Sequence, residues 1–199
     1  MRIYLVTDER LLLGKDLYRT VEAAVKGGVS MVQLREKESS TREFVERAIR
    51  LKEVLTPYGV PLIINDRVDV ALAADADGVH VGQSDMLYEM VKRLLPEGKI
   101  IGLSVESPEQ VLEANNYDLD YVAASPVFST TTKTNTIVEW GLDGLRWIRS
   151  VSRHPLVAIG GIHSNNVASI CKAGADSVAV ISAIVSADDP ERAARELLE

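Results

Sequence analysis

The sequence has few of the features that mark membrane or secreted proteins. It holds one cysteine in 199 residues, so no disulfide can form within the chain. No apolar run approaches the roughly 20 residues that cross a membrane, and residues 1–8 become polar too early for a signal peptide. We therefore expect a cytoplasmic protein with no membrane partner.

Positive charge is also in short supply. The chain has 22 Lys and Arg against 29 Asp and Glu, a net charge of −7, which disfavours broad binding to nucleic acid. A phosphorylated small molecule is still possible, because its site needs only local positive charge. The lone Cys171 lies in an apolar helical stretch, where a free cysteine usually packs as a small hydrophobe rather than acting as a nucleophile.

One pattern recurs along the whole chain: a short β-branched run, a polar turn and an amphipathic helical segment. Most runs are continuously apolar, which is typical of parallel strands covered on both faces. Eight such units at about 25 residues each predict a single α/β domain over residues 1–199, a small (β/α)8 TIM barrel. An open doubly wound sheet is the alternative. The predicted strands lie at about residues 3–7, 31–35, 61–65, 78–82, 100–104, 120–124, 156–160 and 177–181.

Capping signals mark several helix starts, and an Asp stands directly before three of the strands. The Asp residues are Asp77, Asp120 and Asp176. The helix starts are marked by Ser40 with a capping-box Glu43, by Ser107-Pro108 with a capping-box Gln110, and by Asp189-Pro190.

The second strand ends in a cluster of cations. Alternation sends Gln33, Arg35 and Lys37 in the same direction while the segment stays extended. Arg can grip phosphate oxygens in pairs and Lys acts as a point charge, so this end suits an anionic ligand. The alternative is an exposed charged loop in which Glu36 and Glu38 neutralise the cations.

Two carboxylates follow the next two strands. Asp66 comes after the third strand and Asp85 after the fourth. In a parallel barrel these strand ends share one face, where the pair could hold Mg²⁺, which prefers oxygen ligands. The alternative is that each Asp is an N-cap, for helices beginning near Arg67 and Met86.

Three later connections also carry candidates. Residues 125–136 form a long, hydroxyl-rich connection with a single lysine, Lys133; such loops are functional or solvated and flexible. Gly160-Gly161 follows the seventh strand and Ser182 the eighth. Loops at these two positions commonly bind phosphate in barrels, which favours the barrel over the open sheet.

The histidines are weaker candidates. His80 lies inside an apolar strand and is interpreted as a satisfied core residue rather than part of the site. His154 precedes a proline in a turn and is interpreted as a surface residue. His163 follows the glycine pair and either approaches a phosphate or packs at a helix start. No zinc-like His/Cys spacing and no Ser–His–Asp set can be assembled from the sequence.

Taken together, these motifs resemble those of the thiamine-phosphate synthase family over nearly the whole chain. Each motif is weak alone, and their fixed order makes the set specific. The motifs are Tyr4-Leu5-Val6-Thr7-Asp8, Gln33 to Lys37, Asn65-Asp66-Arg67, residues 77–83 followed by Asp85, Thr130 to Lys133, residues 158–162 and residues 180–184.

The resemblance implies a reaction and a site. It implies a transferase that joins a hydroxymethylpyrimidine diphosphate to a thiazole phosphate and releases diphosphate, with Asp66 and Asp85 holding Mg²⁺. The implied diphosphate-side residues are Gln33, Leu34, Arg35, Glu36, Lys37, Asn65, Ser104 and Lys133, of which Arg35, Lys37, Ser104 and Lys133 would be catalytic. The implied thiazole-phosphate residues are Thr130, Thr131, Thr132, Gly161, Ile181 and Ser182.

The sequence departs from the family pattern after the sixth strand. Ser125-Pro126 stands where the family usually has Gly-Pro, Ser129 where it has Pro, and Thr134 where Pro follows the lysine. Fewer prolines predict a less stiff loop. Two related alternatives follow: a thiazole tautomerase-like paralogue and a barrel that binds phosphate ligands without catalysis. A different barrel enzyme acting on phosphorylated small molecules is a third, and the order of the motifs counts against it.

Overall fold

Eight parallel strands close into a ring in chain order, because β1 pairs with β8 as well as with β2. The protein is seen as a computed structural model that describes residues 2–129 and 139–199. The predicted barrel is confirmed, and the open sheet is excluded. The strands are β1 (Arg2–Val6), β2 (Val29–Leu34), β3 (Leu62–Asn65), β4 (Gly78–Val81), β5 (Ile100–Val105), β6 (Tyr121–Ala124), β7 (Leu156–Ile159) and β8 (Ser177–Val180).

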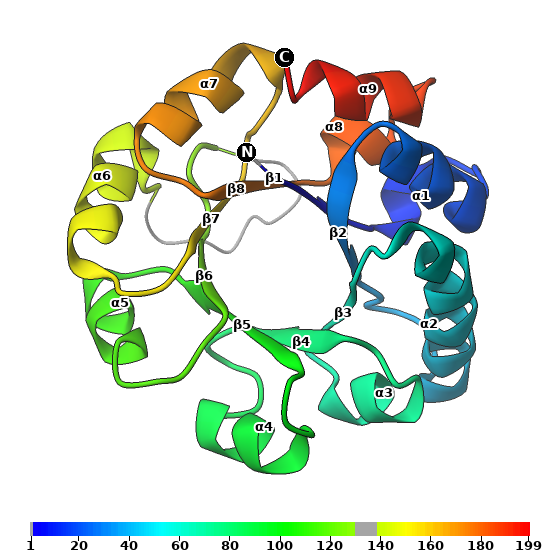
Figure 1. The fold of residues 1–199 in the computed structure, drawn as a ribbon, viewed down its shortest axis with the longest axis horizontal. Helices are drawn as coiled ribbons and strands as arrows, with labels where there is room; N and C mark the ends of the chain where they lie inside the picture. The colour runs from blue at the N-terminus through cyan, green and yellow to red at the C-terminus, as the bar shows by residue number, and fades with distance from the viewer. Residues whose placement is uncertain (1, 130–138) are drawn as a thin grey trace.

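Helices surround the strands on the outside, as Figure 1 shows, and α9, the last helix, packs beside α1. Short 3-10 helices, η1 (Glu9–Leu12) and η2 (Thr56–Tyr58), extend two of the connections. The α-helices are α1 (Leu17–Lys26), α2 (Thr41–Leu55), α3 (Val68–Ala73), α4 (Tyr88–Leu94), α5 (Pro108–Ala114), α6 (Gly141–Val151), α7 (Ser164–Lys172), α8 (Ser182–Val185) and α9 (Pro190–Glu196).

Alternation along each strand divides the buried side chains into two sets. In β1, Ile3 and Leu5 belong to the large core between strands and helices. Tyr4 and Val6 belong to a smaller cluster inside the barrel. Because the interior set is small and includes two tyrosines, Tyr4 and Tyr121, the barrel has a polar floor beneath its carboxyl-end rim.

The Asp residues noted before three strands each bind the neighbouring strand. The Asp77 carboxylate accepts the backbone N–H of Leu62 at the start of β3, at 2.8 Å. Asp120 accepts from the backbone N–H of Ile101, the second residue of β5, and Asp176 accepts from that of Leu156, the first residue of β7, both at 2.8 Å. Strands β4, β6 and β8 are thus each fastened to the strand before them at the amino-end rim.

The helix starts agree with the sequence except in one detail. Ser40 and Glu43 form a capping box, and Asp189 caps α9. Ser107 caps α5 as expected, but the Gln110 side chain accepts from Glu106 N at 2.7 Å instead of from the cap residue. The predicted capping box at α5 is therefore wrong in its second half, because the amide reaches one residue further back.

His154 is a correction. It was expected at the surface, yet it is only 5% exposed. Its Nδ1 lies 3.1 Å from the carbonyl oxygen of Leu119 and its Nε2 lies 2.9 Å from that of Ala114. The ring therefore packs under the α5–β6 connection with its two nitrogens beside two carbonyl oxygens, a long-range contact that the local sequence does not indicate.

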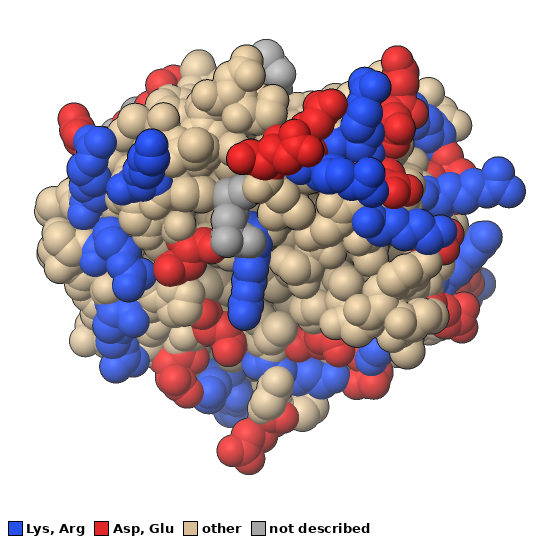
Figure 2. All heavy atoms as spheres, turned by 45° about the horizontal axis from the view of Figure 1, so that its top comes forward, with Lys and Arg blue, Asp and Glu red and all other residues tan. Residues whose placement is uncertain are grey.

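The remaining global features agree with the composition. Acidic and basic side chains are mixed over the face that Figure 2 displays, with uncharged surface between them. Within the described residues, no helix has the length and apolar character to cross a membrane. Cys171 is partly buried against the outer core, and burial raises the pKa of its thiol, which disfavours the reactive thiolate.

Candidate active site

A cavity of about 980 Å³ opens at the carboxyl-end rim of the barrel. Side chains from nearly all the strand ends line it, which is where barrels place their sites. Of the predicted residues, those lining the cavity are Gln33, Arg35, Lys37, Asn65, Asp66, Asp85, Ser104, Gly161, Ile181 and Ser182. The structure thus brings together segments that are up to about three quarters of the chain apart.

The end of β2 supplies the cations. Gln33, Arg35 and Lys37 all line the cavity, as their alternation predicts. Leu34 is fully buried in the outer core, so its side chain faces away from the cavity. A role for Leu34 in binding could involve only its backbone.

Arg35 is held from β1. Its guanidinium Nη1 donates to Asp8 Oδ2 at 2.7 Å, and its backbone N–H donates to Thr7 Oγ1 at 3.1 Å. Asp8 is anchored in turn, because its other oxygen accepts from Arg10 N at the start of η1. Thr7 and Asp8, the last two residues of the first motif, therefore hold Arg35 in place, and Asp8 orients its guanidinium.

Glu36 acts behind the site rather than in it. Its side chain is 3% exposed and its Oε2 accepts from Arg47 Nη1 at 2.7 Å and from Ser39 Oγ at 2.9 Å. Burial raises the pKa of Glu36, although the Arg47 guanidinium opposes the shift. The Arg47 pair fastens the β2–α2 loop to helix α2, and a substrate contact from Glu36 stays a prediction.

Asp66 and Asp85 face one another across the rim. The Asp66 backbone has a φ of 62° in the left-handed region and its N–H donates to His80 O at 2.8 Å. Its carboxylate accepts from Lys37 Nζ at 2.6 Å. The Asp85 carboxylate accepts from Gly82 N at 2.7 Å. Neither Asp caps a helix, since α3 begins at Val68 and α4 at Tyr88.

This carboxylate pair fits a hard cation. Burial raises the pKa of Asp85, and the adjacent Asp66 carboxylate adds to the shift because the two negative charges repel. Oxygen donors and two neighbouring charges suit Mg²⁺, which keeps most of its waters and takes one or two carboxylates. Within residues 2–129 and 139–199, no group of three or more acidic, His or Cys residues is arranged for a metal, so these two stand as a pair.

The floor of the cavity is a buried polar chain. Gln33 Nε2 donates to Tyr4 Oη at 2.6 Å, and Tyr4 Oη lies 2.8 Å from Tyr121 Oη. His80 bridges Tyr121 Oη at 3.0 Å and Ser104 Oγ at 2.9 Å with its two ring nitrogens. His80 is thus satisfied by hydrogen bonds, as the core interpretation expects, and it also lines the cavity.

The opposite wall is formed by the ends of β7 and β8. Gly160 and Gly161 have φ values of 107° and 65°. A Cβ on Gly161 would lie 2.8 Å from Phe128 Cβ, so only glycine brings the chain this close to the β6 connection. Ile181 and the exposed Ser182 complete this wall. His163 lines the cavity as well, and its backbone N–H donates to Asn166 Oδ1 at the start of α7.

Four predicted site residues lie outside the described part of the chain: Thr130, Thr131, Thr132 and Lys133. The described residues that precede them in this connection do reach the cavity. The cavity wall beside Gly160 is lined by Ser125, Pro126 and Ser129. Ser125 and Ser129 are the first two departures from the family pattern.

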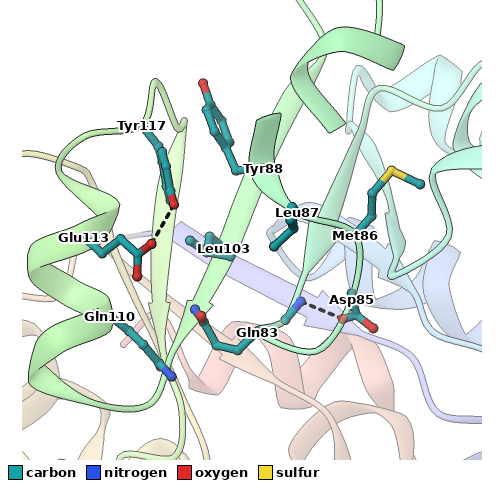
Figure 3. Close-up of a pocket in the computed structure, with 10 residues that line it drawn as sticks. Gln83, Asp85, Met86, Leu87, Tyr88, Leu103, Gln110, Glu113 and Tyr117 are labelled. Atoms are coloured by element: carbon teal, nitrogen blue, oxygen red, sulfur yellow. Dashed lines mark hydrogen bonds between the residues drawn. The ribbon is translucent and has the colours of Figure 1, made fainter. Parts of the chain in front are cut away.

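A second, smaller recess of about 70 Å³ adjoins the cavity between α4 and α5. Figure 3 shows Gln83 and Asp85 at its edge, with the Tyr117 hydroxyl directed to Glu113. The recess is too small for a substrate of the expected size, and it borders the site only through the β4–α4 loop.

Sequence reasoning gave no roles to Tyr4, Tyr121, Asp8 and Thr7, which support the site. The sequence carries a signal for Tyr4 and Asp8, because both belong to the first motif. It also carries one for Tyr121, because a large side chain with a polar hydroxyl stands within an otherwise apolar strand. The partners they meet lie on other strands, however, and only the closed ring brings them together.

Comparisons with known proteins agree with this geometry. The family model described as thiamine monophosphate synthase matches residues 3–184. The thiamine-phosphate synthase of Albidiferax ferrireducens is 52% identical over 99% of this chain and 90% of its own, and that of Vibrio campbellii is 50% identical over 99% and 96%. A solved thiamine phosphate pyrophosphorylase from Pyrococcus furiosus covers 99% of this chain and 93% of its own, with a TM-score of 0.90 and 41% identity.

The resemblance drawn from the motifs is therefore confirmed over nearly the full length of the chain. The sequence motifs predict that two carboxylates, the rim cations and a glycine-lined wall surround one cavity, and the structure has this arrangement. The chain belongs to the thiamine monophosphate synthase family.

Proposed function

We propose that this protein is a transferase that forms thiamine phosphate. It joins 4-amino-2-methyl-5-hydroxymethylpyrimidine diphosphate to 4-methyl-5-(2-phosphooxyethyl)thiazole and releases diphosphate. The observation that carries the proposal is the joint placement of Arg35, Lys37, Asp66 and Asp85 on the rim of one cavity. Close relatives with the corresponding name span nearly the whole chain.

The reaction needs charge stabilisation more than proton transfer. The bond between the pyrimidine methylene carbon and the diphosphate oxygen breaks, and its electron pair leaves with diphosphate. The thiazole ring nitrogen then supplies the electron pair of the new C–N bond and carries no proton to remove. Positioned cations that meet the growing negative charge on the leaving oxygen therefore account for most of the rate gain.

The residues at the β2 end serve this purpose. Arg35, oriented by Asp8, and Lys37, positioned beside Asp66, offer donors to the diphosphate oxygens. Asp66 and Asp85 would hold Mg²⁺, which supplies further positive charge to the leaving group when bound. By the family resemblance, Lys133 joins them and Asn65 and Ser104 bind the pyrimidine diphosphate.

The glycine-lined wall takes the second substrate. The backbone at Gly160 and Gly161 can approach a phosphate closely, and Ser182 offers a hydroxyl at the start of α8. We assign the thiazole phosphate to this wall, together with Ile181 and, by resemblance, Thr130, Thr131 and Thr132. The pyrimidine then lies over the polar floor, between the two anionic groups.

The direct test mixes both substrates with and without Mg²⁺ and measures thiamine phosphate and released diphosphate. We expect both products in equal amounts, with formation lost after the metal is chelated. Tautomerisation of the thiazole phosphate without condensation would favour the paralogue, and binding without turnover would favour the silent barrel. The expected cytoplasmic location stays a prediction, to be checked by cell fractionation.

A further inference from the structure

The polar floor joins two predicted substrate-binding residues by an unbroken hydrogen-bond chain. It runs from Gln33 on β2 through Tyr4 on β1 and Tyr121 on β6 to His80 on β4 and Ser104 on β5. All five side chains are buried, with relative exposures of 9% or less. The two ends line the cavity, whereas Tyr121 lies beneath it and does not.

The position of the central phenol is built into the barrel. Tyr121 pairs with Gly102 of β5, and a Cβ on Gly102 would lie 2.1 Å from Tyr121 Cζ. The Tyr121 ring stacks on His80 with centroids 5.5 Å apart, and it meets Tyr4 edge-on at 5.8 Å. Only glycine at position 102 leaves this room, so the hydroxyl of Tyr121 is fixed between Tyr4 and His80.

If every buried donor is satisfied within this hydrogen-bond chain, the chain has one direction, because each hydroxyl has a single hydrogen to donate. Burial raises the pKa of both tyrosines, so both hydroxyls keep that hydrogen. Gln33 Nε2 donates to Tyr4, which leaves Tyr4 to donate to Tyr121 and Tyr121 to donate to His80 Nδ1. With Nδ1 accepting, the imidazole carries its hydrogen on Nε2 and donates to Ser104 Oγ.

This direction fixes what each end offers to a ligand. Gln33, which lines the cavity, uses one of its two amide N–H groups on Tyr4, and its carbonyl oxygen remains as an acceptor for a ligand. Ser104 receives a hydrogen from His80, so its own hydroxyl hydrogen is left as a donor. An acceptor at one end and a donor at the other complement an aminopyrimidine, whose amino group donates and whose ring nitrogens accept.

We propose that Tyr4 and Tyr121 are positioning residues that set the hydrogen-bond polarity of Gln33 and Ser104 and thereby select an aminopyrimidine over its oxo counterpart. An oxo ring presents an acceptor where the amino group donates. At the Gln33 carbonyl oxygen an oxo group would set acceptor against acceptor, and turning the Gln33 amide over to avoid this would reverse the hydrogen-bond chain. The inference rests on the proposed function, because it takes the pyrimidine diphosphate as the substrate.

The test compares Tyr121→Phe with the wild-type enzyme on two substrates, the aminopyrimidine diphosphate and the analogue with an oxo group in place of the amino group. Phe keeps the ring and the Gly102 contact and removes only the hydroxyl. We expect the preference for the amino substrate, as a ratio of kcat/KM values, to fall by about tenfold, the scale of one hydrogen bond. The KM for the thiazole phosphate should stay within about twofold.

Two controls separate this role from general stability. Tyr88→Phe removes a hydroxyl that bonds the backbone of Asp118 and takes no part in the hydrogen-bond chain from Gln33 to Ser104. It should leave the ratio of kcat/KM values unchanged. Tyr4→Phe breaks the same chain at another link and should lower the ratio as Tyr121→Phe does, so it replaces that variant should Tyr121→Phe fail to fold. An unchanged ratio in a folded Tyr121→Phe or Tyr4→Phe enzyme overturns the proposal.

The tautomer of His80 gives a readout that does not depend on turnover. In ¹⁵N-histidine-labelled protein, assigned with His80→Asn, we expect wild-type His80 to hold its hydrogen on Nε2 alone and Tyr121→Phe to populate both tautomers. Hydrogen on Nδ1 in the wild type, or one unchanged tautomer in the variant, contradicts the proposal. If wild-type enzyme forms no thiamine phosphate, the proposed function fails instead, which the product assay shows independently.

Discussion

At the scale of single residues, the site depends on charges whose positions are set by neighbours. The Lys37 side chain is 53% exposed, so without a partner it could adopt many rotamers. Its ammonium group nevertheless contacts Asp66 Oδ2 at 2.6 Å. Arg35 is held more tightly, by Asp8 and Thr7. The cations are therefore preorganised to different degrees, and Arg35 is the more rigid donor for the diphosphate.

We predict that Lys133→Ala lowers the rate of the chemical step by about a hundred- to a thousand-fold, the usual cost of losing one group that stabilises charge in the transition state. The prediction rests on the sequence, which puts the one lysine of residues 125–136 at this position. Single-turnover kinetics at saturating substrates would measure it. Lys92→Ala, which removes an exposed lysine paired with Asp118, is the control and should keep the wild-type rate.

At the scale of elements, the barrel is assembled from fastened strand pairs. Asp77, Asp120 and Asp176 each accept a backbone N–H at the start of the strand before their own, so three strand pairs are joined by the same type of contact. The motif Asp before a strand is visible in the sequence, but its partner is about 15 to 20 residues upstream and could not be named. The structure supplies the partner.

We predict that Asp77→Ala lowers the free energy of unfolding by roughly 1–3 kcal/mol, because it leaves the N–H of Leu62 without its charged acceptor. Urea unfolding followed by circular dichroism would measure the change. Asp118→Ala is a matched control, since that carboxylate pairs with the exposed Lys92 and such pairs contribute less than about 1 kcal/mol. Equal losses in both variants would contradict the fastening role.

A second element-level feature responds to pH. Asp75 lies between Lys52 of α2 and Lys99 before β5, and hydrogen bonds from these two ammonium groups lower its pKa from 3.8 to about 2. A lowered pKa in the folded state means that the stabilisation is full above about pH 4 and is lost as the pH falls toward 2.

We therefore predict that Asp75→Asn flattens the dependence of Tm on pH between about pH 4 and pH 2. Asn suits the left-handed backbone at this position, where φ is 46°, so the substitution removes the charge with little strain. Thermal melts at several pH values would measure the effect. Identical pH profiles for the two proteins would show that the lysine contacts contribute nothing to stability.

At the scale of the whole molecule, ring closure creates the site. Asp66 and Asp85 follow different strands, and each has its own partner: Asp66 pairs with Lys37 from the end of β2, and Asp85 accepts from Gly82 in its own loop. The pair exists only because neighbouring strand ends share one rim. A ligand that bridges the rim should therefore stabilise the whole barrel against unfolding, in proportion to its occupancy.

We predict that Mg²⁺ with diphosphate raises the Tm of the wild-type protein, with about 2.7 kcal/mol gained at a hundred times Kd. The Mg²⁺-dependent part of this shift should vanish in the Asp66→Asn, Asp85→Asn double variant, because Mg²⁺ loses both carboxylates. Diphosphate with a chelator serves as the baseline for each protein. A double variant with the full Mg²⁺ response would remove both residues as metal ligands.

The sequence by itself determined the order and type of the elements, since apolar runs and capping signals act within a few residues of one another. It also determined the ligand chemistry of the rim, because cations, carboxylates and glycines occur at successive strand ends. The tertiary structure decided which side chains meet: Tyr4 with Tyr121, Asp8 with Arg35, and buried His154 with two distant carbonyl groups. Those contacts depend on strand register and ring closure, which act across the whole chain and leave no local signal.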